Sequence, residues 1–200
     1  MHFPKETSQF VIKNAAILEA GLIETVQDTV FKAINAHLEK RIRALGGWKG
    51  KYELVSGEAD ATTFAPVAWP EDKDGRFRAC YKLTALETDD NNYWLSNTLG
   101  VNGSKLCLRF WVHGGLAGRT KGEIERKLVT LSNAPAVRDA RMVRDEDNTI
   151  YLPFSFDAET LAMEYPTVDK TLVPLDAALD KLLKVNELFD AAVKDLATRK

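Results

Sequence analysis

Apolar residues at intervals of three and four predict a helix in the N-terminal part of the chain. Between residues 23 and 45 they alternate with charged and amide side chains, as in a helix with one buried face. The apolar positions are Ile23, Val26, Val30, Ile34, Leu38 and Leu45. Gly46-Gly47 is expected to end this helix. Gly21 either kinks it or separates it from an earlier segment that begins near Ser8.

The same periodicity predicts a second long helix at the C-terminus. Pro174 suits its first turn, because the amide hydrogen that proline lacks would have no partner there. The apolar stripe consists of Leu175, Leu179, Leu182, Phe189, Val193 and Leu196. A helix of about 25 residues is roughly 37 Å long, enough to cross a sheet completely. It is expected to pack within the monomer, with pairing between two copies through the terminal helices as the alternative.

The middle of the chain has the pattern of an antiparallel sheet. Turn-forming sequences such as PEDKDG and VNGS separate segments rich in aromatic and β-branched residues. We expect strands near 51–56, 62–69, 76–86, 93–99 and 105–113, and a further hairpin formed by ARMV and TIYLPFSF. Between them, Thr120 and Glu123 fit a capping box at the start of a helix.

These elements predict an α+β fold, in which an antiparallel β-meander sheet is packed on one face by long N- and C-terminal helices. We expect a single domain over residues 1–200. It would consist of a helical segment at 1–47, the sheet at 48–156 with an inserted helix near 120–132, and C-terminal helices at 157–200.

Side chains alternate along each predicted strand and give the sheet two different faces. One set is apolar, for example Phe110 and its neighbours two residues away, and should lie under the helices. The other set mixes aromatic and basic residues: Arg78, Lys82, Trp94, Arg109, Trp111, His113 and Tyr151. Aromatic rings beside Arg are typical of protein-binding surfaces and also suit stacking on nucleic-acid bases. The pattern equally fits an ordinary exposed sheet on which basic stems cover aromatic rings.

The charge distribution adds a second candidate surface. The chain has 27 Lys and Arg against 29 Asp and Glu, a net charge of −2, which argues against a strongly basic nucleic-acid protein. Residues 105–144 nevertheless contain nine basic and three acidic side chains. Within them a glycine-rich stretch, His113–Lys121, leads into the capped helix, where Arg119 and Lys121 would add positive charge. Its spacing matches no phosphate-binding motif.

We therefore predict a non-enzymatic binding protein. Its surface would consist of Arg78, Lys82, Trp94, Arg109, Trp111, His113, Arg119 and Lys121. The expected partner is an acidic protein surface, with nucleic acid as the second possibility and a homodimer through the terminal helices as a further association. We expect no cofactor and no metal.

The alternative is a metal-dependent phosphodiesterase or nuclease. Glu58 and Asp60 would hold a divalent cation, and Lys82 would contact the scissile phosphate. Cys80 stands two residues before Lys82, where an acidic residue would strengthen this reading. His113 is the one histidine placed for acid–base chemistry, without an evident partner.

The cysteines and the N-terminus indicate a cytoplasmic protein. Cys80 and Cys107 lie in apolar segments without a second cysteine at metal-ligand spacing, so we expect buried free thiols. The first ten residues contain no apolar run typical of a signal peptide.

Overall fold

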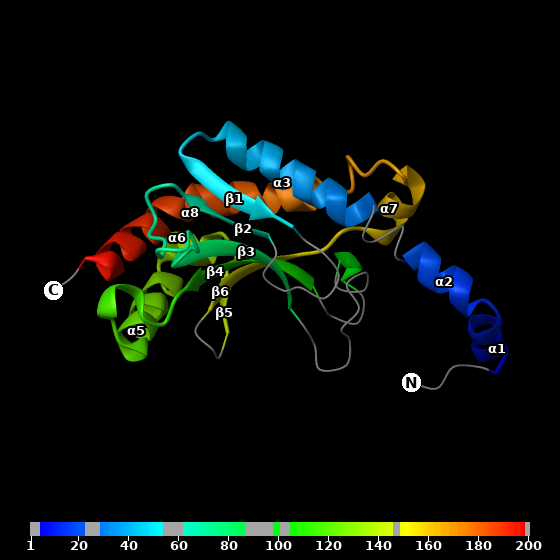
Figure 1. Cartoon of the computed structure of the whole chain (residues 1–200), viewed down its shortest axis with the longest axis horizontal. Helices are drawn as coiled ribbons and strands as arrows, with labels where there is room; N and C mark the ends of the chain where they lie inside the picture. The colour runs from blue at the N-terminus through cyan, green and yellow to red at the C-terminus, as the bar shows by residue number, and fades with distance from the viewer. Residues whose placement is uncertain are drawn as a thin grey trace.

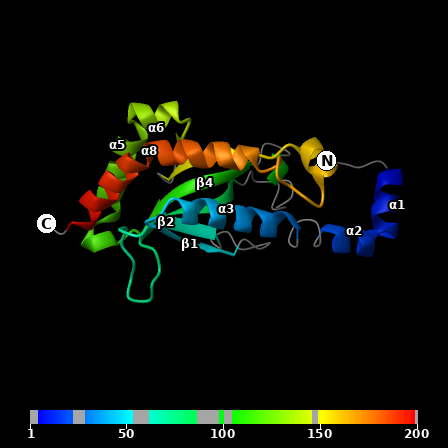
Figure 2. The same ribbon diagram turned by 90° about the horizontal axis from the view of Figure 1, so that it is seen from above.

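A layer of helices packs on one face of an antiparallel sheet. The computed structural model describes residues 5–22, 29–53, 62–86, 98–100, 105–145 and 149–198. Figure 1 shows α3 (Lys32–Ala44) and α8 (Val173–Ala197) on the same side of the sheet, and the view from above in Figure 2 agrees. The α+β fold predicted from the sequence is therefore confirmed.

The sheet has six strands in the order β1-β2-β3-β4-β6-β5, and every pair is antiparallel. The strands are β1 (Trp48–Tyr52), β2 (Thr62–Pro66), β3 (Ala79–Leu86), β4 (Lys105–Val112), β5 (Val143–Arg144) and β6 (Ile150–Phe154). The first four follow one another as a meander. In the last hairpin, β6 pairs with β4 and buries its apolar residues. The short exposed strand β5 forms the edge of the sheet.

The remaining described helices flank this core. They are α1 (Lys5–Lys13), α2 (Ala15–Leu22), α5 (Lys121–Ser132), α6 (Pro135–Asp139) and α7 (Ala158–Glu164), with a 3-10 turn, η3, at Leu116–Gly118. Helices α1 and α2 lie beyond the end of the sheet that is remote from the C-terminus (Figures 1 and 2). None of the described helices combines the length and the apolar character that crossing a bilayer requires.

Apolar spacing explains why α3 and α8 cover the sheet. Ile34, Leu38 and Ile42 recur at four-residue steps along α3 and are fully buried. Helix α8 buries nine residues on one face: Leu175, Ala178, Leu179, Leu182, Val185, Phe189, Ala192, Val193 and Leu196. The ring of Phe189 meets that of Phe110 on β4, with 4.7 Å between centroids. The predicted packing of the C-terminal helix within the monomer is thus what the structure shows.

Polar contacts fix the position of α8 over the core. The buried Trp69 donates its indole N–H to Asp190 over 3.0 Å, and the hydroxyl of Tyr81 donates to Asn186 over 2.9 Å. At the other end of α8, Arg41 on α3 reaches both Asp176 and Asp180. These contacts satisfy polar groups that would otherwise be buried at a cost.

Several predicted element boundaries are corrected by the structure. Helix α3 ends where Gly46 and Gly47 adopt φ values of +62° and +67°, and the first strand begins directly afterwards, three residues earlier than predicted. The predicted strand at 93–99 is wrong for its described part, because Thr98 and Leu99 are helical. Residues 93–97 lie outside the described residues. The capping box is confirmed, since Thr120 and Glu123 each accept from the backbone N–H of the other.

Candidate interaction surface

The strand register brings aromatic and basic side chains together on the sheet face turned away from α3 and α8. Lys82 on β3 pairs with Arg109 on β4, and Arg109 pairs in turn with Tyr151 on β6. Trp111 lies two residues further along β4. Because side chains alternate, these residues point away from Phe110 and the core. We call Lys82, Arg109, Trp111, His113 and Tyr151 the aromatic-basic face.

Lys82 and Trp111 form the most closely packed contact of this face. The ammonium nitrogen of Lys82 lies 4.2 Å from the centroid of the Trp111 ring, within cation–π distance. Only 9% of Lys82 is exposed, whereas Trp111 is half-buried and packs against the core. The aromatic-basic face is therefore only partly exposed to solvent. The apolar stem of Lys82 lies down on the sheet, as such stems do beside aromatic rings.

Arg109 occupies the centre of the aromatic-basic face. The Asp145 carboxylate approaches it, with 3.9 Å between Nη2 and Oδ2. Its Nε is buried and has no hydrogen-bond acceptor among the described residues, although 32% of the side chain is exposed. A guanidinium has five N–H donors in a planar fork. The exposed part of the Arg109 guanidinium can therefore donate to an oxygen acceptor of a partner, whereas the buried Nε is out of a partner's reach.

Asp145 belongs to this surface but is not among the predicted binding residues, because the sequence places it only in the polar turn RDEDN of the last hairpin. Its carboxylate accepts from the backbone N–H of Thr149 over 2.7 Å and from the hydroxyl of the same residue. These bonds close the β5–β6 turn and hold the carboxylate beside Arg109. The acidic cluster around the turn was the available signal, but only the pairing of β6 with β4 brings it to Arg109.

Burial raises the pKa values of the two acidic groups next to Arg109. Desolvation raises the pKa of the Cys107 thiol to about 12, which keeps it neutral and unreactive as a nucleophile. Burial also raises the pKa of Tyr151, and the nearby Asp145 carboxylate adds to this effect. The Tyr151 hydroxyl therefore stays protonated and able to donate a hydrogen bond. Both cysteines are buried free thiols, as predicted.

Arg78 and His113 lie together at one end of the aromatic-basic face. The backbone N–H of His113 donates to the carbonyl of Arg78 over 2.8 Å, and the imidazole meets Trp111 edge-on with 6.0 Å between centroids. The Nδ1 atom of His113 accepts from the N–H of Gly115 over 3.1 Å. Arg78 also lines a cavity of about 530 Å³ between the turn at 70–74, η3 and the end of α8.

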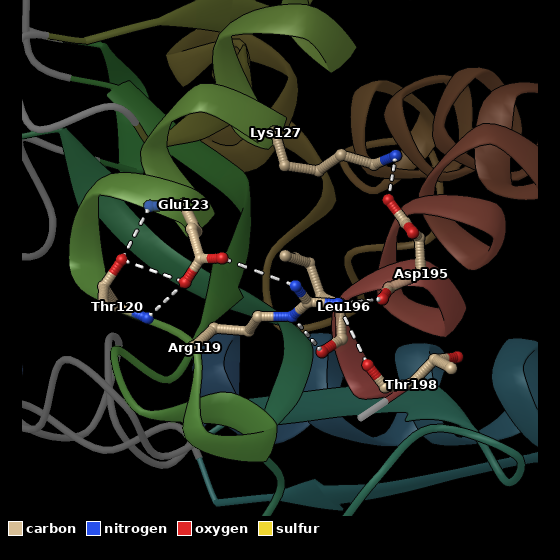
Figure 3. Close-up of polar contacts among 7 residues, drawn as sticks. All are labelled: Arg119, Thr120, Glu123, Lys127, Asp195, Leu196 and Thr198. Carbon is tan, nitrogen blue, oxygen red and sulfur yellow. Dashed lines mark hydrogen bonds and ion pairs between the residues drawn. The ribbon is translucent and has the colours of Figure 1, made fainter. Parts of the chain in front are cut away.

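Arg119 is directed to a different place from the one expected. Its guanidinium donates to the backbone carbonyls of Asp195, Leu196 and Thr198 at the C-terminal end of α8, over 3.1, 3.4 and 3.0 Å (Figure 3). Nη1 also lies 3.5 Å from Glu123, and only 14% of the side chain is exposed. Arg119 thus binds within the molecule, where a cation satisfies helix carbonyls that have no intrahelical partner.

The other predicted binding residues are dispersed. Lys121 is 86% exposed on the first turn of α5 and lies 3.7 Å from Glu125. Trp94 lies outside the described residues. The structure therefore brings together Lys82, Arg109, Trp111 and His113, with Arg78 at their margin, and separates Arg119 and Lys121 from them.

The glycine-rich stretch after β4 forms a compact turn. Residues 113–119 contain η3, in which Ala117 has φ +51° and Gly118 has φ +79°. Arg119, the expected source of positive charge in this turn, is bound to α8. The stretch therefore links the sheet to the end of α8.

The residues of the hydrolase alternative are not brought together in the described part of the chain. Glu58 and Asp60 lie outside the described residues, and Lys82 is held over Trp111. Among the described residues no group of three or more His, Cys, Asp and Glu side chains has the arrangement of a metal site. The alternative stays a prediction without a supporting observation.

No family model matches the chain, and comparisons with curated proteins and with solved structures gave no significant match.

Proposed function

We propose that the protein binds an acidic surface of a partner protein through the aromatic-basic face. The observation that carries the proposal is the position of Arg109. Its partly exposed guanidinium lies between Lys82 and Tyr151, with Trp111 alongside. A planar donor next to an aromatic ring provides the directional bonds and rigid contact area on which protein interfaces depend.

The charges around this face favour a protein over a nucleic acid. Acidic side chains lie among the basic ones: Glu71 pairs with Lys49, Glu53 with Lys51, and Asp145 approaches Arg109. Duplex DNA carries a negative charge about every 1.7 Å, so such carboxylates would repel its backbone. A protein surface with a few discrete carboxylates can be matched to Arg109 and Lys82 without this repulsion.

The basic segment 105–144 supports the proposal at longer range. Arg126, Arg138 and Arg141 are exposed on and after α5 and α6, and no ion pair involves them within the described residues. Exposed positive charge accelerates association with an acidic partner and loses this effect in high salt. We assign these residues to attraction of the partner and the aromatic-basic face to its specific contact.

We further propose that the protein is cytoplasmic, in keeping with its free buried thiols. Self-association is restricted to the N-terminal helices, because α8 already buries its apolar face in the monomer.

Titration with two anionic probes, one a peptide and one a nucleic acid, tests which kind of partner the protein binds. A fluorescent peptide rich in Glu and Asp is compared by anisotropy with a single-stranded oligonucleotide of similar charge. We expect Arg109→Gln to weaken peptide binding about tenfold or more. Arg138→Gln removes one exposed arginine elsewhere and should change it less than about twofold.

Two results would contradict the proposal. In one, the oligonucleotide binds with a steep salt dependence while the peptide does not, which favours the nucleic-acid alternative. In the other, the peptide binds equally well to Arg109→Gln and to the unchanged protein. Urea unfolding of each variant shows that the comparison is made on folded protein.

A further inference from the structure

Helices α1 and α2 form an arm with almost no packing against the rest of the described molecule. Every described side chain of α1 and α2 is exposed, and none of α1 is buried. Both helices lie beyond the end of the sheet, past the N-terminal end of α3 (Figures 1 and 2). We call residues 5–22 the N-terminal arm.

The lengths of these helices show that the arm needs something to pack against. Helix α1 has nine residues and α2 has eight. Isolated helices shorter than about 12–15 residues are marginal in water, because nucleation is costly and only packing of an apolar face compensates for it. The backbone continues from one helix to the next through Asn14, whose N–H donates to Phe10 over 3.1 Å. This continuity alone supplies no buried apolar surface.

The arm also exposes apolar side chains that are usually covered. Phe10 is 59% exposed and Ile12 is 75% exposed. Val11, Ile17 and Leu18 are also exposed, and Phe10 lies on the side of α1 that carries Glu6 and Lys13. Large apolar side chains exposed together on elements that pack on nothing in the described molecule indicate an interaction site.

We propose that a second copy of this chain covers the arm, with α1 of one copy packed antiparallel against α1 of the other. The inference rests on the self-association named in the proposed function and is independent of the aromatic-basic face.

The charge pattern of α1 supports this orientation. Glu6 and Lys13 are seven residues apart, two helical turns, so they lie on one face with Phe10 between them. An antiparallel pair centred between residues 9 and 10 places Glu6 opposite Lys13 of the second copy. By symmetry, Lys13 then lies opposite Glu6 of that copy. The two Phe10 rings then lie near the symmetry axis. No ion pair within the described residues engages Glu6 or Lys13, and the antiparallel arrangement also opposes the helix dipoles favourably.

The size of α1 limits the strength of the pair. Helix α1 has nine residues, and a standard interface involves about 20–30 residues on each side. In a symmetric pair the same surface serves both partners, so we expect a weak dimer.

Sedimentation velocity of the full chain from about 1 to 100 µM tests the proposal. We expect a monomer–dimer equilibrium in this range. Lys13→Glu and Glu6→Lys each place like charges opposite one another, and each should weaken dimerisation several-fold to about thirtyfold. The double variant Glu6→Lys/Lys13→Glu restores opposite charges and should return to nearly the original affinity. Phe10→Ala should weaken it by about a hundredfold.

Lys184→Glu is the matched control, since it reverses one exposed charge on the outer face of α8. Its dimer affinity should stay within about twofold of the original. Far-UV circular dichroism should show loss of helix on dilution of the unchanged protein, because the arm loses its cover.

Three outcomes overturn the proposal. The first is a monomer at all concentrations. The second is a monomer that binds anionic lipid vesicles in a Phe10-dependent manner, which identifies a membrane surface as the occupant. The third is a dimer that the double charge variant does not restore, which excludes the antiparallel α1 pair. Normal dimerisation of Arg109→Gln would separate this result from failure of the partner-binding proposal.

Discussion

The position of Arg119 predicts that this residue stabilises the protein and contributes little to partner binding. Replacing it by Met keeps an apolar stem of similar length and removes the guanidinium. The change leaves the carbonyls of Asp195, Leu196 and Thr198 without their donor. It also removes the contact with Glu123.

The contacts of Arg119 give the expected magnitude. Hydrogen bonds to a charged group contribute about 1.5–3 kcal/mol each when buried. Here one of the three is long, at 3.4 Å, and the freed carbonyls at the end of α8 regain water. The pair with Glu123 is screened by solvent and adds little to this. We expect a loss of about 2–3 kcal/mol, which lowers the Tm of a chain of this size by roughly 5–10 °C.

Urea unfolding followed by circular dichroism measures this loss, and Lys121→Met is the matched control. Lys121 is also basic and only two residues away, but it is exposed and should change stability by less than about 0.5 kcal/mol. Hydrogen exchange provides a second readout, because amides in the last turn of α8 should exchange faster in Arg119→Met. Equal stability of Arg119→Met and the unchanged protein would refute the assignment.

Three further predictions follow from single side chains. Phe110→Ala should cost about 3–5 kcal/mol in urea unfolding, because the ring is fully buried against Phe189 and Trp69; a loss below 1 kcal/mol would contradict the packing. Bonds from Thr120 lower the pKa of Glu123, so its contribution to stability is complete above the usual carboxyl pKa and is lost as the pH falls through the lowered value. Glu123→Gln keeps an acceptor without titrating, so its Tm should fall less than that of the unchanged protein between about pH 7 and pH 3. Cys107 should react with a thiol reagent only after urea unfolding, and rapid labelling of the native protein would show that the thiol is not buried.

Local patterns in the sequence were sufficient to predict much of the fold. Apolar spacing identified α8, and the Thr120–Glu123 pair identified the start of α5. Alternation along the strands placed Lys82, Arg109 and Trp111 on one face, which the register confirms. Each of these inferences depends on residues close together in the chain, where helix and strand periodicity determine direction.

Contacts between distant segments were not predictable in the same way. Arg119 meets residues 76–79 positions away at the end of α8. Its sequence neighbours placed it instead beside Lys121 in a glycine-rich stretch, as a source of positive charge. The burial of Lys82 likewise depends on how its stem lies against Trp111, and Asp145 reaches Arg109 only because β6 inserts beside β4. Periodicity specifies which side of an element a residue occupies and leaves open what faces it.

An NMR titration of the indole N–H resonances with the acidic peptide tests directly whether the peptide binds at the aromatic-basic face. We expect a progressive shift of the Trp111 resonance, assigned with Trp111→Phe, because this ring lies beside Arg109 on that face. The Trp69 resonance should stay in place, since that indole is buried and bonded to Asp190. In Arg109→Gln the Trp111 shift should be lost at the same peptide concentration. A Trp111 resonance that does not move, or that moves equally in Arg109→Gln, would contradict binding at the aromatic-basic face.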